Sequence, residues 1–250
     1  MARLITRTGL DLAGARMFAP SAELVKEYSE AIVSANDPQD RRIQELIREY
    51  ILRNFAPDPK TGRKRRVMML LFKGEDAVRK VRGVVGNISA DRRGGETIRD
   101  TFGDLILDEE KQVRYFEPAV LAAPNSEEAQ QKLRLWARHS DEDGGILEGT
   151  IVYPPEETPQ RTLVLIKPDN FRFPTGRPGN VIDFFSRTGL YIVGIKVHQM
   201  SVAQAEEFYG PVRDVLRTKL NDVVAAKAKA SLEKSPSEHA IRRLQLVPIK

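Results

Sequence analysis

The segment from residue 87 to residue 104 carries the residue types of this chain that best suit phosphate binding. It is rich in glycine and arginine, contains Arg99 and is expected to be a loop. Exposed backbone N–H groups and planar guanidinium forks both match the oxygens of a phosphate. The other basic cluster, Lys60–Arg66, has no aromatic side chains between its cations, so we expect a solvated loop there and no nucleic-acid partner.

Histidine and cysteine are the other residues that would carry chemistry. The chain has no cysteine, which excludes disulfides and cysteine-bound metals. Its three histidines are His139, His198 and His239. His198 lies in an alternating apolar pattern and is expected to be structural. His139 ends a helical pattern, where a positive charge favours the helix dipole.

Hydrophobic periodicity predicts the elements that position these residues. Expected strands are Leu10–Phe18, Val67–Phe72, Gln112–Leu121, Arg161–Lys167 and Tyr191–Gln199. In the first half of the chain we expect a short helix after Ser21, helices over Asp40–Phe55 and Glu75–Val85, and one from Asn125 or Ser126 to about His139. In the second half we expect helices from Pro178 to about Arg187 and from Ser201 to about Lys234, and a short helix near Glu238. This order is typical of an α+β, ferredoxin-like antiparallel sheet with helices packed on it.

An internal repeat indicates a duplicated domain. Arg7-Thr8-Gly9-Leu10 recurs as Arg187-Thr188-Gly189-Leu190, and Gly14, Ser21 and Glu27 recur as Gly194, Ser201 and Glu207. We expect a first copy over residues 1–139 that lacks its first strand, and a linker over 140–160. A second partial copy over 161–250 then supplies a first strand, a helix and a second strand. We expect Thr162–Lys167 to fill the vacant place in the first copy's sheet.

Motifs in both copies resemble the nucleoside diphosphate kinase family. Leu163–Asp169 resembles that family's first strand, which ends in Lys-Pro-Asp, and Glu206–Tyr209 resembles the helix after its second strand. In the first copy, Phe72–Arg82 is similar to its third strand and following helix, and Glu96–Arg99 to its Gly-Thr-Ile-Arg segment. Pro118–Glu127 lies along its active-site stretch without a gap.

The resemblance implies phosphoryl transfer from a nucleoside triphosphate to a histidine and then to a nucleoside diphosphate. It implies that Lys167, Arg82, Arg99 and Tyr209 are nucleotide-binding residues and that Mg²⁺ arrives with the bound nucleotide. The composite sheet would bring Lys167 near the two arginines. The family's homo-oligomers imply self-association, which unpaired strand edges also favour.

Three positions depart from the family pattern. Leu121 stands at the position of the nucleophilic histidine, Pro118 at that of the active-site asparagine, and Ile88 at that of a phosphate-contacting threonine. Leucine has no lone pair to accept a phosphoryl group, so we assign no catalytic residue. We expect a nucleotide-binding protein without phosphotransfer. The alternatives are an active kinase, through an unmatched histidine or a partner chain, and a scaffold or truncated fragment without nucleotide affinity.

The amino-acid composition limits the remaining classes of function. Lys plus Arg number 40 against 35 Asp plus Glu, a net charge of +5 that permits anionic partners without choosing among them. No stretch approaches the roughly 20 apolar residues of a membrane-spanning helix, and the first residues have no signal-peptide pattern. We therefore expect a soluble, cytoplasmic protein without a membrane partner.

Overall fold

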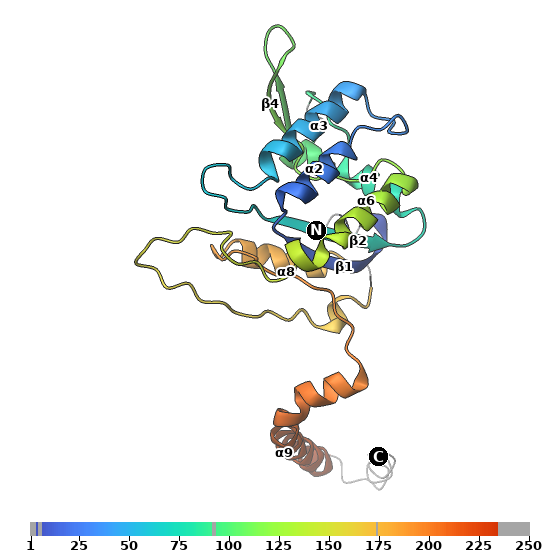
Figure 1. Ribbon diagram of the computed structural model, residues 1–250. Helices are drawn as coiled ribbons and strands as arrows, with labels where there is room; N and C mark the ends of the chain where they lie inside the picture. Colours follow the sequence, from blue (N-terminus) through green and yellow to red (C-terminus); the bar gives the residue numbers. More distant parts are fainter. Residues whose placement is uncertain (1–3, 5–6, 92–93, 174, 235–250) are drawn as a thin grey trace. The chain divides into compact units, whose positions relative to one another are not determined.

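The computed structural model describes residues 4, 7–91, 94–173 and 175–234 (Figure 1). The chain divides into two compact units, residues 1–197 and residues 198–250. Each is described by itself. The short helix expected near Glu238, and His239, lie outside the described residues.

A two-stranded antiparallel sheet organises the first unit. Strand β1 (Asp11–Phe18) pairs with β2 (Val67–Lys73), in a register that runs from Asp11 opposite Lys73 to Phe18 opposite Val67, with an irregularity between Leu12 and Gly14. Both strands are confirmed where the apolar patterns predicted them. β2 contributes side chains to two cores because alternate residues of a strand point to opposite faces.

Three helices pack against one face of this sheet. They are α2 (Ala22–Glu30), α3 (Arg41–Asn54) and α6 (Ser126–Arg138). Each begins at a polar side chain that accepts a backbone N–H bond: Ser21 from Leu24 (3.2 Å), Asp40 from Arg42 (2.8 Å) and Asn125 from Glu128 (2.9 Å). These caps satisfy donors that a helix leaves unpaired at its start, which explains why the sequence marks these boundaries well.

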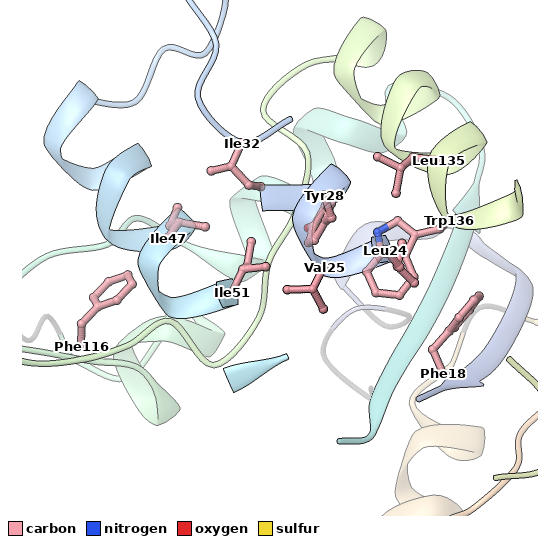
Figure 2. Packing of buried hydrophobic residues seen from close by; sticks show 10 residues of the cluster. All are labelled: Phe18, Leu24, Val25, Tyr28, Ile32, Ile47, Ile51, Phe116, Leu135 and Trp136. Atoms are coloured by element: carbon pink, nitrogen blue, oxygen red, sulfur yellow. The ribbon is translucent and has the colours of Figure 1, made fainter. Parts of the chain in front are cut away.

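Aromatic residues fill the core between these helices and the sheet (Figure 2). The Trp136 ring contacts Phe18 at 5.0 Å and Tyr28 at 5.2 Å between ring centroids, both edge to face. Leu24 and Ile51 are completely buried beside them. Val67 and Met69 of β2 face this core, whereas Leu70 and Phe72 face a smaller one formed with Val84, Val85 and Ile98. Burial raises the pKa of Tyr28.

The smaller core is covered by α4 (Ala77–Val85) and the short α5 (Ile98–Phe102). We expected a loop over residues 87–104, and α5 corrects that expectation. Thr97 and Asp100 form a capping box, in which each side chain accepts the backbone N–H of the other, at 3.1 and 3.2 Å. This reciprocal cap supports a helix too short for an apolar periodicity to reveal.

A second antiparallel pair follows, β3 (Asp104–Leu107) with β4 (Val113–Glu117). β4 lies within the segment Gln112–Leu121, where a strand was expected, and β3 was missed. β4 ends where Pro118 removes a backbone donor from the ladder. Antiparallel sheets with packed helices confirm the α+β class, while one ferredoxin-like sheet stays a prediction.

Residues 140–147, the start of the expected linker, are ordered and packed. α7 (Ser140–Asp143) places the buried Asp143 carboxylate beside the start of α2. It accepts bonds from the Ser21 N–H (2.9 Å), the Ser21 hydroxyl (2.7 Å) and the Lys64 ammonium (2.7 Å). Burial alone would raise the pKa of Asp143, but these bonds outweigh it and hold the pKa below its usual range.

Residues 161–167 and 191–199 form no strand, which contradicts two predicted elements. In the described residues β2 pairs with β1 alone, and Leu163 is 80% exposed. A strand needs a ladder of backbone bonds to a neighbouring strand. In the second segment the Val193 carbonyl accepts the Leu147 N–H at 2.8 Å, and this bond is not continued into a ladder. Around them lie a 3₁₀ turn, η1 (Pro168–Asn170), and α8 (Arg177–Ser186), the latter as expected. Ile192 and Ile195 pack beside Met17 and Met68 of the sheet.

The second unit consists, in its described part, of the long helix α9 (Val202–Lys234), which confirms the expected helix. It contains Pro211. Its apolar side chains are largely exposed, among them Phe208, Val212, Val215, Leu220 and Val224. Within the described ranges, no helix is long and apolar enough to cross a membrane.

Candidate functional site

Two of the four predicted nucleotide-binding residues, Arg82 and Arg99, lie close together. Arg82 is half-buried in the last turn of α4, and Arg99 lies in the first turn of α5. Burial, and then the positive charge of Arg82, lower the pKa of Arg99 to about 10. In the part of the chain that the structure describes, neither guanidinium forms an ion pair. Two like charges without a counter-ion create a positive potential that attracts an anion.

The Arg99 side chain also ties two backbone segments together. Its Nη1 donates to the Gly86 carbonyl and its Nη2 to the Val120 carbonyl, each at 2.9 Å. Its Nε is buried without a partner among the described residues. Arg99 thus joins the end of α4 to the segment 118–121, the stretch that resembles the family's active site.

That stretch has an unusual backbone at Ala119, and side chains on either side of it pack in the protein interior. Ala119 has φ of 58°, and the Val120 N–H donates to the Pro118 carbonyl at 2.6 Å, as in a γ-turn. Pro118 is fully buried, and Leu121 packs against the aromatic core together with Ile88. The positions that resemble the family's histidine and threonine are therefore packing residues in this chain.

Glu117 supports the same turn from the side of α3. Its carboxylate accepts the Tyr50 hydroxyl at 2.9 Å and the Ala119 N–H at 3.0 Å. Burial and this hydrogen bond raise the pKa of Tyr50. The Tyr50–Glu117 pair fixes the strained residue Ala119, which costs of the order of 1–3 kcal/mol to hold in this conformation.

The other two predicted residues are found on other elements of the chain. Lys167 is exposed just before η1, and its backbone carbonyl accepts the Asn170 N–H at 3.0 Å. Because residues 161–167 do not join the sheet, the structure does not form the predicted composite site. Tyr209 lies on α9 in the second unit, 51% exposed, on one helix face with Arg213 and Arg217.

The two described histidines differ in their surroundings. His139 packs at the end of α6, with its Nε2 3.4 Å from Glu27 and its Nδ1 3.9 Å from Asp143. His198 is exposed at the start of the second unit. No cluster of three or more metal-binding side chains occurs among the described residues.

The structure also assembles cations that the sequence reasoning missed. Arg42 and Arg53 of α3 line a groove with Arg114 of β4. Residues 42, 46, 49, 50 and 53 have helical spacing, so one helix face could have been recognised from the sequence. The contact between this helix face and β4 could not be predicted from the sequence, because more than 50 residues separate the two elements.

Comparison with known proteins relates the second copy to one family. Residues 160–224 match the family model "Nucleoside diphosphate kinase". A nucleoside diphosphate kinase of Staphylothermus marinus is 48% identical over 50 residues, which cover 20% of this chain and 34% of that protein. One of Anaplasma phagocytophilum is 42% identical over 55 residues, covering 22% and 38%. No solved structure matches the chain significantly.

The chain thus spans little more than a third of the curated relatives it matches. The similarity of residues 1–139 to the same family rests on the repeat and the motifs, and it stays a prediction. The match over residues 160–224 contains Lys167 and Tyr209 and agrees with the resemblance drawn from those motifs. This part of the chain is related to the nucleoside diphosphate kinase family.

Proposed function

We propose that this protein binds a nucleoside di- or triphosphate and does not transfer its phosphate. Arg82 and Arg99 contact the phosphates, and Mg²⁺ accompanies them on the nucleotide's own oxygens. The observation that carries the proposal is the Arg82–Arg99 pair, which forms no ion pair among the described residues, beside a turn whose nucleophile position holds Leu121, packed against the core.

The chemistry of the site supports binding more than turnover. Guanidinium groups bind phosphate through paired N–H donors, and Arg82 has no hydrogen bond to another described residue. A phosphoenzyme needs a nucleophile such as an imidazole. Leu121, partly buried against the aromatic core, has no lone pair that could accept a phosphoryl group.

Lys167 and Tyr209 lie in the segment 160–224 that matches the family model, and they stay candidate nucleotide-binding residues. Residues 161–167 do not join β2, so no contact between Lys167 and the arginine pair enters the proposal. In the described residues β2 pairs with β1 alone, and such an open edge favours self-association.

Titration of the full-length protein with Mg-ADP, by calorimetry, tests the binding step. Arg82→Gln should weaken binding about tenfold, the size of one charge-assisted hydrogen bond. Arg79→Gln is the matched control: it lies on the same helix, removes the same charge and loses only the exposed Asp76 pair. Equal loss in both variants, or no binding by the parent protein, contradicts the proposal.

A second candidate is an active nucleoside diphosphate kinase, favoured by the names of the matched relatives. It requires a histidine from elsewhere, in this chain or in a partner. Transfer of phosphate from ATP to GDP by the purified chain would establish it. Loss of that transfer in His198→Gln would then identify the carrier.

A further inference from the structure

A groove between α3 and β4 has no part in the proposal above. Its volume is about 760 Å³, within the range of sites that hold small ligands. One wall is the outer face of α3, with Arg42, Tyr50 and Arg53. The other is β4, with Arg114 and Tyr115. The groove is open along one side.

The charges in this groove are uncompensated. Three arginines line it with one acid, Glu49. Over the described ranges none of the three pairs with a carboxylate, and only Arg42 makes a hydrogen bond, to the Lys111 carbonyl at 3.2 Å. On the same helix, Arg41 and Arg48 both pair with Glu45 at 3.4 Å. The arginines of α3 that line the groove are therefore those without a carboxylate partner among the described residues. Their positive charge favours binding of an anion.

Aromatic rings are interleaved with these cations. Tyr115 is 49% exposed beside Arg114, and Tyr50 lies between Arg42 and Arg53 with its hydroxyl fixed on Glu117. An exposed ring offers a stacking surface for a base, and guanidinium groups track a phosphate backbone. Bases are accessible in this way only where the strand is unpaired.

The basic loop Lys60–Arg66 is a useful contrast. Lys64 pairs with Asp143 at 2.7 Å, Arg65 approaches Asp58 at 4.0 Å, and Arg66 lies over the Tyr191 ring. These three cations therefore already interact with other side chains of the protein. The loop has no aromatic rings between its cations, which argued against nucleic-acid binding there. The groove does have such rings.

We propose that the α3–β4 groove binds single-stranded nucleic acid. Arg42, Arg53 and Arg114 contact successive phosphates, and Tyr115 stacks on a base. The site is separate from the Arg82–Arg99 pair, on which the proposed nucleotide binding depends.

Fluorescence anisotropy with the full-length protein and labelled ten-nucleotide oligomers, one of thymidine and one of uridine, tests this site. Three phosphate contacts predict that log Kd changes with log salt with a slope of about 2 in magnitude. The two oligomers distinguish DNA from RNA as the source of the strand. Saturating Mg-ADP should leave the affinity unchanged, because the two sites are separate.

Three variants locate the binding. Tyr115→Ala should weaken it about tenfold. Arg114→Gln should weaken it and lower the salt slope by about 0.7. Arg41→Gln is the control, with the same charge change one residue from Arg42 but outside the groove lining. The melting temperature of each variant confirms that it is folded.

Three results would overturn the proposal. The first is no binding of either oligomer at 50 mM salt and protein concentrations up to about the 100 μM typical of weak non-specific complexes. The second is equal weakening by Arg41→Gln and Arg114→Gln, which would show diffuse attraction to a basic surface. The third is displacement of the oligomer by Mg-ADP, which would show that the oligomer and the nucleotide bind to the same site.

Discussion

The repeated segments 7–18 and 187–198 begin alike and then differ. Gly9 and Gly189 both have positive φ, 63° and 80°, a conformation that glycine adopts without strain. In each copy the threonine before the glycine accepts the N–H of the leucine after it, at 3.3 Å from Leu10 and 3.4 Å from Leu190. Each threonine also donates to a carbonyl of the preceding turn, of Leu4 or of Phe185.

Beyond the turn the copies diverge. Residues 11–18 form β1, paired with β2 and covered by the Trp136 core, whereas residues 191–198 form no strand. The turn depends on contacts within four residues, so the sequence alone determines it. The strand depends on β2, a distant neighbour, and the second copy has no equivalent of β2 in the described chain.

Hydrogen exchange should show the largest contrast. Backbone amides of residues 67–73 and 11–18 that bond across the sheet should exchange roughly a thousandfold more slowly than those of residues 195–198, because their opening requires global unfolding. Peptide-resolved mass spectrometry measures this. Equal protection would show that residues 191–198 are a paired strand in solution and would revise the comparison.

Trp136→Ala should destabilise the first copy by about 4 kcal/mol, as expected for loss of a buried aromatic. Phe184→Ala, at a side chain that is 72% exposed in α8, should change stability by less than about 0.5 kcal/mol. Urea unfolding followed by circular dichroism gives both values. A large effect of Phe184→Ala would mean that the second copy packs on something in solution.

Asp143→Asn should cost about 2 kcal/mol at pH 7, because it weakens the bonds to Lys64 and Ser21. The pKa of Asp143 is depressed in the folded state, so its contribution is present above the unfolded value of about 4 and is lost as pH falls below it. The stability difference between the parent and the variant should therefore shrink between about pH 5 and pH 2. A constant difference would contradict an ionic role.

Thr8→Val and Thr188→Val test the shared turn. Thr8 is buried, so its loss should cost about 1 kcal/mol in global unfolding. Thr188 is exposed, and its loss should cost less than about 0.5 kcal/mol. Differential scanning calorimetry of the two variants gives the comparison, and a larger cost at Thr188 would reverse the assigned roles.

The sequence predicted those elements that local chemistry marks. The caps Ser21 and Asp40 and the apolar runs at β1 and β2 placed the main elements of the first copy. Prediction failed at Arg161–Lys167 and Tyr191–Gln199, because a strand forms only when a neighbouring strand pairs with it. It also failed at α5, which is too short to show an apolar periodicity. Of the site, motif similarity selected Arg82 and Arg99, and their role in nucleotide binding stays a prediction. The groove residues Arg42 and Arg114 were missed because a helix and a distant strand must meet before their charges combine.

Intact-mass analysis after incubation with Mg-ATP, with phosphate transfer from ATP to GDP followed alongside, tests the central claim most directly. Our account predicts no acid-labile phosphoryl adduct and no transfer, together with a melting temperature raised by Mg-ADP. An adduct with turnover would contradict the account and show that a histidine outside the Pro118–Leu121 turn carries the phosphate.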